Sequence, residues 1–207
     1  MDIQTNFNIF NIFIGSASVH GVFFALILLL SKKFNNQTNR YLAYVVLLIS
    51  INNLYYLVMD SNLYKILGWK YYPLYRIPWD LLLLPMYFYF VASYLGKKKS
   101  IIKQYTLPFY IASFLHIVII LSHLFFRSYK KTYLTYFKSL NTFFEYFTIL
   151  FTIFIIYKVF KLIINFEKES KGFNVKKVTK KTKWLKQLLY AALGICTFWF
   201  IVVIYNS

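Results

Sequence analysis

The sequence predicts an all-α membrane protein, a polytopic bundle of about six transmembrane helices. Of its 207 residues, 59% are hydrophobic, 14% are charged and only 6 are acidic. A soluble domain of this length needs a larger charged shell. The aromatic share is 23%, and aromatic rings with polar tips favour membrane–water boundaries. Long apolar runs without turn residues complete the pattern, because they are too long for strands.

A membrane span needs roughly 20 mostly apolar residues, about 30 Å at 1.5 Å per residue. Six runs approach this length, and we expect them to form one transmembrane domain over residues 1–207. The runs are Ile9–Ser31, Tyr41–Met59, Asp80–Leu95, Ile101–Phe126, Leu140–Phe160 and Trp184–Tyr205. The third run is the shortest and contains Pro85. A proline is tolerated in a span because neighbouring helices satisfy the freed carbonyl.

The orientation follows from the basic residues between the runs. Seventeen of the 24 Lys and Arg residues lie in or beside the first, third and fifth loops. Cytoplasmic loops carry the excess of Lys and Arg, so these loops are predicted to be cytoplasmic and both termini to be outside. The four basic residues of the fourth loop run against this orientation. The densest group is expected to anchor the chain on anionic lipid. This group is Lys176, Lys177, Lys180, Lys181 and Lys183.

No catalytic signature is present. The sequence has no His-Glu-x-x-His, no phosphate-binding glycine loop and no Gly-x-Ser-x-Gly. Cys196 is the single cysteine, which excludes an intramolecular disulfide and a cysteine-based zinc site. The basic residues behind the net charge of +18 lie between the apolar runs, where membrane anchoring charges are placed, so we expect no nucleic acid to contact this chain itself. We predict that the chain is not an enzyme and has no metal or cofactor.

Ionisable groups inside spans are costly and therefore informative. Counting from the basic anchors places Asp80, Glu145, His123 and Asn53 in the outer half of the membrane. They are predicted to form a candidate ligand pocket that opens outward. The alternative is that each group meets headgroups or water by itself. His116 and His123 share a helix face, since they are seven positions apart; packing with hydrogen bonds is the ordinary role of such histidines.

The first run contains a patch of small residues. Ala17 and Gly21 are four positions apart within it, and this spacing lets another helix approach closely. The pattern predicts helix packing at this face rather than a function. The packing partner is expected to be either another helix of the same chain or a second copy of the chain.

Four segments together resemble one known family. They are Phe34–Ala43 with its Asn-Arg-Tyr-Leu-Ala end, Leu84–Leu95, Tyr105–Phe109 and Lys183–Leu189. In their order and spacing they resemble the membrane-spanning N-terminal region of certain bacterial AraC-type transcription regulators. In that family a bundle of about seven spans precedes a cytoplasmic helix-turn-helix domain that binds DNA. The resemblance covers about residues 10–205 and implies a bacterial inner-membrane sensor.

The chain departs from the family pattern in two ways. The glycine of the family's Gly-Pro-Leu segment is missing from Leu83-Leu-Pro-Met86. A seventh span and the DNA-binding domain are also missing, so the sequence is expected to be a fragment of a longer regulator. The resemblance implies a signal-input module that responds to an unidentified small molecule or to a state of the membrane. A small stand-alone protein such as a transporter, and the sensor part of a histidine kinase, are the alternatives.

Overall fold

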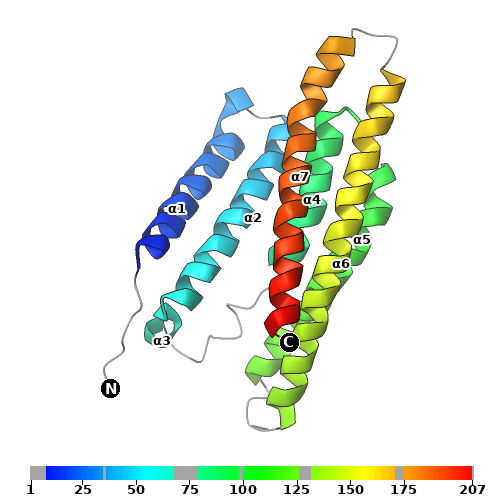
Figure 1. The fold of residues 1–207 in the computed structure, drawn as a ribbon. Helices are drawn as coiled ribbons and strands as arrows, with labels where there is room; N and C mark the ends of the chain where they lie inside the picture. Colours follow the sequence, from blue (N-terminus) through cyan, green and yellow to red (C-terminus); the bar gives the residue numbers. More distant parts are fainter. Residues whose placement is uncertain are drawn as a thin grey trace.

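The computed structural model describes residues 8–34, 36–67, 79–97, 100–125, 132–170 and 175–206. Every regular element within these ranges is helical (Figure 1), so the all-α prediction is confirmed for the described residues. The elements are α1 (Ile9–Leu30), the 3-10 turn η1 (Lys32–Phe34), α2 (Gln37–Asp60), α3 (Leu63–Leu67), α4 (Trp79–Tyr94), α5 (Ser100–Phe125), α6 (Thr132–Glu169) and α7 (Val175–Asn206).

Four helical stretches are long and apolar enough to cross a membrane. They are Ile9–Leu30, Gln37–Asp60, Ile102–Ser122 and Tyr146–Glu169. Their outer surfaces are apolar as well: α1 exposes Phe10 by 73% and Phe13 by 68%. Soluble proteins rarely expose such continuous apolar faces, and the chain is a membrane protein.

The predicted count of about six spans is not confirmed. The helix α4 has 16 residues, which gives about 24 Å at 1.5 Å per residue, less than the roughly 30 Å of a hydrocarbon core. The helix α7 has 32 residues, but its first three turns are rich in lysine. Its apolar part is therefore much shorter than the helix.

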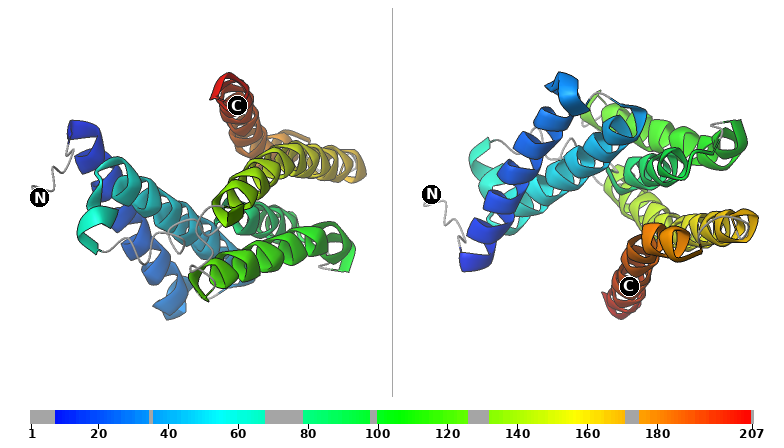
Figure 2. Two further views of the ribbon diagram at one scale, coloured as in Figure 1. Left: turned by 90° about the horizontal axis from the view of Figure 1, so that it is seen from below. Right: turned by 90° about the horizontal axis from the view of Figure 1, so that it is seen from above.

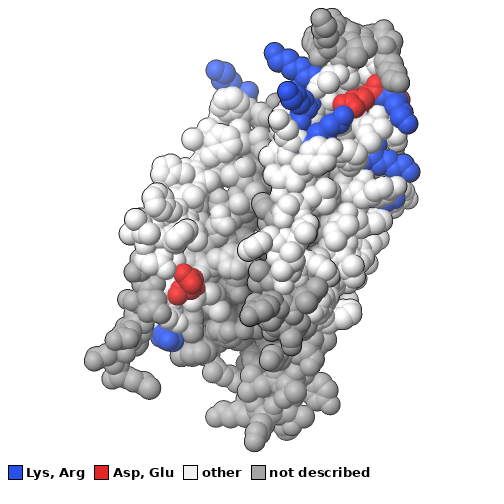
Figure 3. Space-filling view, in the orientation of Figure 1, with Lys and Arg blue, Asp and Glu red and all other residues white. Residues whose placement is uncertain are grey.

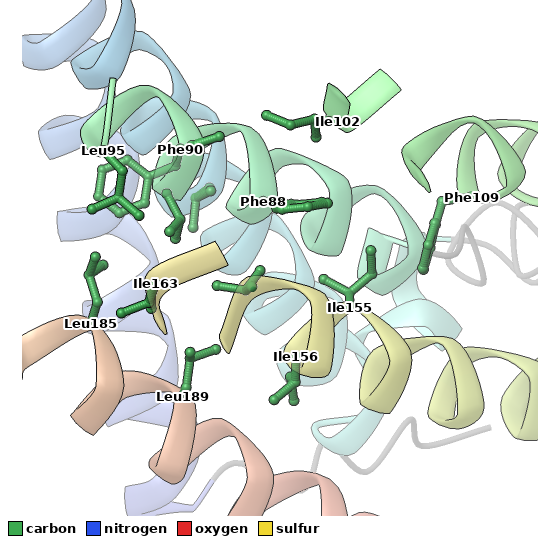
Figure 4. Packing of buried hydrophobic residues seen from close by; sticks show 14 of the residues in the cluster. Phe88, Phe90, Leu95, Ile102, Phe109, Ile155, Ile156, Ile163, Leu185 and Leu189 are labelled. Carbon is green, nitrogen blue, oxygen red and sulfur yellow. The ribbon is translucent and has the colours of Figure 1, made fainter. Parts of the chain in front are cut away.

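Contacts between pairs of helices connect the bundle from α1 to α7. The helix α1 packs on α2, α2 packs on α4, α4 contacts α5 and α6, and α6 contacts α7. Seen along the helices, the α1–α2 pair lies at one side and α4 to α7 form the rest (Figure 2). The main core lies among α4, α5, α6 and α7 (Figure 4), where aromatic and aliphatic side chains interlock. It includes Phe88, Phe90, Leu95, Ile102, Phe109, Ile155, Ile156, Ile163, Leu185 and Leu189.

The contact between α1 and α2 is built on small residues. On α1, Ser18 and Ala25 are fully buried, and Gly21 lies between them. A Cβ added at Gly21 would overlap the hydroxyl of Ser50 on α2, so the two backbones approach as closely as a glycine allows. Ala17 is exposed. The packed face therefore combines Gly21 with Ser18 and Ala25, and the exposed Ala17 lies beside it.

Candidate functional site

The two ends of the molecule differ in charge. The ends of α1, α4 and α6 and the starts of α2, α5 and α7 all lie at one end of the bundle, which we call the basic end (Figure 1). On the face that Figure 3 shows, most of the Lys and Arg side chains gather at the basic end, with acidic side chains among them. The helix ends that border the first, third and fifth loops thus lie at the same end of the bundle.

A glycine-dependent turn ends α4 at the basic end. Gly96 has a φ of 72°, a conformation that favours glycine. The turn is closed by two backbone hydrogen bonds, of 2.9 Å from the Lys97 N–H to the Ala92 carbonyl and of 3.1 Å from the Gly96 N–H to the Ser93 carbonyl. This turn places the Lys97 ammonium against the carboxylate of Glu169 at the end of α6.

A second carboxylate joins α6 to α7. Glu167 accepts hydrogen bonds from the Thr182 hydroxyl and from the Lys186 ammonium, the latter at 2.7 Å. The Glu167 and Lys186 side chains are only 24% and 28% exposed, and Thr182 is completely buried. The Glu169 side chain, by contrast, is 63% exposed. The Glu167–Lys186 ion pair is therefore stronger than the Glu169–Lys97 ion pair, because water screens it less.

An aromatic corner lies next to these ion pairs. The Trp184 indole N–H donates a 3.2 Å hydrogen bond to the Tyr94 hydroxyl, and the two rings meet edge to face at 5.3 Å. The Lys181 ammonium lies 5.0 Å from the Tyr94 ring centroid and 5.5 Å from that of Phe166. Tryptophan, tyrosine and lysine are the residues that mark a membrane–water boundary, and this corner has that chemistry.

The corner lies at one end of a large groove between α2, α4, α6 and α7, because Trp184 belongs to both. The groove has a volume of about 540 Å³, within the roughly 300–1,000 Å³ of small-molecule sites. Its walls are almost entirely aliphatic and aromatic, with Tyr87, Thr152 and Cys196 adding a few polar atoms. The lining residues are Leu42, Val45, Val46, Ile49, Leu83, Leu84, Tyr87, Phe90, Thr152, Ile155, Ile156, Trp184, Leu188, Ala191, Ala192 and Cys196.

No protein-family model, no curated protein and no solved structure matches this chain. The candidate site is therefore defined by its own residues: the groove, the aromatic corner and the two carboxylates that join the helices. Among the described residues, no three His, Cys, Asp or Glu side chains gather as ligands for a metal ion.

Most side chains of the predicted outward pocket lie outside the described part of the structure. Asn53 is half-buried on α2. Asp80, His123 and Glu145 belong to α4, α5 and α6, but their side chains lie outside the described part of the structure. Their convergence stays a prediction.

The neighbouring polar residues of α5 and α6 are described. The Thr148 hydroxyl donates to the Phe144 carbonyl and the Thr152 hydroxyl to the Thr148 carbonyl, each at 2.7 Å. Both hydroxyls are thus bonded within their own helix, and Thr152 also lines the groove together with Cys196 of α7. The ring of His116 is buried and stacks on Phe144 with 4.2 Å between the centroids, which is a packing role.

The predicted lysine anchor belongs to the first turns of α7. Lys180, Lys181 and Lys183 are exposed at the basic end. Lys176 and Lys177 begin the same helix, and their side chains lie outside the described residues.

Sequence reasoning missed the connection through Glu167 and the aromatic corner. One signal was available, because Glu167 and Glu169 are two of the 6 acidic residues in the chain and lie within its most basic region. Rare carboxylates among many lysines indicate ion pairs. The groove left no comparable signal, since its lining residues resemble those of every other apolar helix.

Proposed function

We propose that this chain is the signal-input module of an AraC-type transcription regulator in the cytoplasmic membrane of a bacterium. The observation that carries the proposal is the continuity of α6 and α7 from the groove to the basic end. They have 38 and 32 residues, about 57 and 48 Å at 1.5 Å per residue. Both exceed the roughly 30 Å of a hydrocarbon core. A change in the groove therefore reaches the basic end through unbroken helices.

The joints at the basic end support this proposal. Glu167 ties α6 to α7, Lys97 ties the end of α4 to α6, and Trp184 ties α7 to α4. Three of the four helices that line the groove are thus joined at the end of the bundle that faces the cytoplasm in this proposal. The family resemblance of segments such as Phe34–Ala43 supports the transcription output over a kinase output.

The proposal includes six spans and an orientation. In it α4 and α7 also cross the membrane, the basic end lies in the cytoplasm, and the N-terminus is outside. Most of the Lys and Arg side chains on the face that Figure 3 shows lie at the basic end, which supports this orientation, because cytoplasmic loops carry the excess of Lys and Arg.

Cysteine labelling on intact cells tests the orientation. In a Cys196→Ala background, we expect Lys180→Cys to resist a membrane-impermeant thiol reagent and Ile66→Cys to react. Both positions are exposed, Lys180 at the basic end and Ile66 on α3 at the opposite end. Both variants should react after the cells are permeabilised. The reverse pattern on intact cells would invert the orientation.

A transporter is less well supported by the groove. A path for ions or polar solutes needs polar groups or charges along its walls, whereas the described walls of this groove are nearly all apolar. The helices α2 and α7 both line the groove but do not form a closely packed pair, so the groove is open between them. This geometry suits an apolar ligand that enters from the membrane.

Transcript profiling tests the proposed function in the source bacterium. If the chain belongs to a regulator, deleting the gene changes the levels of a defined set of transcripts. We expect Ala191→Phe, which fills the groove, to reproduce part of this change, and Leu193→Phe to leave transcripts at wild-type levels. Both positions are exposed on α7, but only Ala191 lines the groove.

Equal protein abundance, measured by immunoblot, makes the two variants comparable. The DNA that follows codon 207 provides an independent check on the output. A helix-turn-helix reading frame there supports the regulator, and a kinase frame supports the other sensor class. A deletion strain with an unchanged transcript profile would refute the proposal.

A further inference from the structure

We infer that the groove binds one acyl chain of an anionic phospholipid, with the lipid phosphate at the lysines of α7. This inference concerns the occupant of the groove and does not depend on whether the chain signals. It rests on the groove's length, its lateral opening and the charge at the end next to the aromatic corner.

The length of the groove matches one leaflet. Along α7 the lining extends from Trp184 to Cys196, which are twelve positions apart, or about 18 Å at 1.5 Å per residue. Half of a roughly 30 Å hydrocarbon core is about 15 Å. The groove thus covers the depth of one leaflet, from the boundary residues of the aromatic corner to the middle of the bilayer.

The wall of the groove suits a hydrocarbon chain. Aliphatic and aromatic side chains line almost all of it, and several of them are open to the lipid phase. Leu188, Ala191 and Ile49 are exposed although they line the groove. Of the helices that line the groove, α2 packs on α4, α4 on α6 and α6 on α7, whereas α2 and α7 do not form a closely packed pair, so the open side lies between α2 and α7. A lipid tail can therefore enter sideways without leaving the apolar layer.

The charge at the end next to the aromatic corner selects the headgroup. Lys181 is exposed one turn beyond Trp184 and shares a helix face with Leu188 and Ala192, which line the groove, because they follow it by seven and eleven positions. The carboxylates of Glu167 and Glu169 already pair with Lys186 and Lys97. The lysine next to the groove thus faces the headgroup layer with an excess of positive charge, which a lipid phosphate complements.

Quenching of Trp184 fluorescence by brominated lipids tests the inference. The chain carries Trp69→Phe, Trp79→Phe and Trp199→Phe, so that Trp184 is the only tryptophan, and is placed in phosphatidylcholine vesicles. Brominated phosphatidylglycerol is expected to reach half-maximal quenching at a mole fraction about fivefold lower than that of brominated phosphatidylcholine. A fivefold preference is what the attraction of about one lysine to anionic lipid contributes.

Two matched pairs of variants separate the headgroup from the tail. Lys181→Gln should bring the ratio of the two mole fractions at half-maximal quenching close to one. Lys183→Gln, on another face of α7, should leave this ratio at its original value. Ala191→Phe should weaken quenching by both lipids, and Leu193→Phe should not. Native mass spectrometry of the wild-type chain provides a second measurement. It should detect one phosphatidylglycerol molecule bound to the wild type and none bound to Ala191→Phe.

Two outcomes would overturn the inference. Equal quenching by both lipids that is insensitive to Ala191→Phe would show only the ordinary lipid shell. No quenching by either lipid, together with Cys196–Cys196 crosslinking between copies, would show that a second chain fills the groove.

Discussion

Replacing Gly21 by leucine is expected to separate α1 from α2 and to destabilise the protein by about 1–3 kcal/mol or more, the usual cost of overpacking. A Cβ at this position already overlaps the Ser50 hydroxyl, and that hydroxyl is held by a 2.8 Å hydrogen bond to the Val46 carbonyl. Neither backbone can give way without moving a whole helix. Thermal unfolding of the purified protein in detergent measures the effect.

The control for this experiment is Ala17→Leu. Ala17 lies one turn away from Gly21 on α1 but is exposed, so a larger side chain there only meets lipid. We expect its unfolding temperature to equal that of the wild type. An unchanged unfolding temperature for Gly21→Leu would contradict the α1–α2 contact, and equal destabilisation by Ala17→Leu would place Ala17 in an interface with a second copy.

Replacing Glu167 by glutamine is expected to loosen α7 from α6. The change leaves the Lys186 ammonium, which is 28% exposed, without its counter-charge and weakens the bond to Thr182. Hydrogen bonds to charged groups contribute about 1.5–3 kcal/mol each, so we expect a loss of about 2–3 kcal/mol. Unfolding in detergent by heat or denaturant reports this loss, and faster proteolysis within 171–174 reports the separation of the two helices.

Glu169→Gln is the matched control, because it removes the same charge two positions away. Its partner Lys97 lies on the turn after α4, and the Glu169 side chain is 63% exposed. Exposed pairs contribute about 0–1 kcal/mol, and we expect a correspondingly small change. Equal losses from the two variants would mean that the net charge of the basic end, rather than the α6–α7 joint, controls stability.

The outline of the fold was predictable because hydropathy and charge act locally. The expected run Ile9–Ser31 differs from α1 by a single residue, and Ile101–Phe126 differs from α5 by one at each end. The bounds of α6 and α7 were less accurate, because both helices continue into polar sequence. Hydropathy detects the lipid-facing part of a helix, whereas backbone hydrogen bonds continue wherever no residue breaks them.

The candidate site shows where sequence reasoning reaches its limit. Counting depths from the lysines placed Glu145, His123 and Asn53 at similar levels, but depth says nothing about which helix faces which. The aromatic corner depends on such a pairing, since Tyr94 and Trp184 are ninety positions apart in the chain. No spacing rule connects residues at that separation.

By itself, the sequence determined that this chain is helical and that it belongs in a membrane. These properties follow from composition and from residues close together in the chain. Only the tertiary structure decided that Gly21 meets Ser50, that Glu167 joins α6 to α7, and that four helices leave a groove between them. The physical reason is that lipid solvates every apolar helix face alike, so hydrophobicity does not choose partners; close packing and a few polar contacts do.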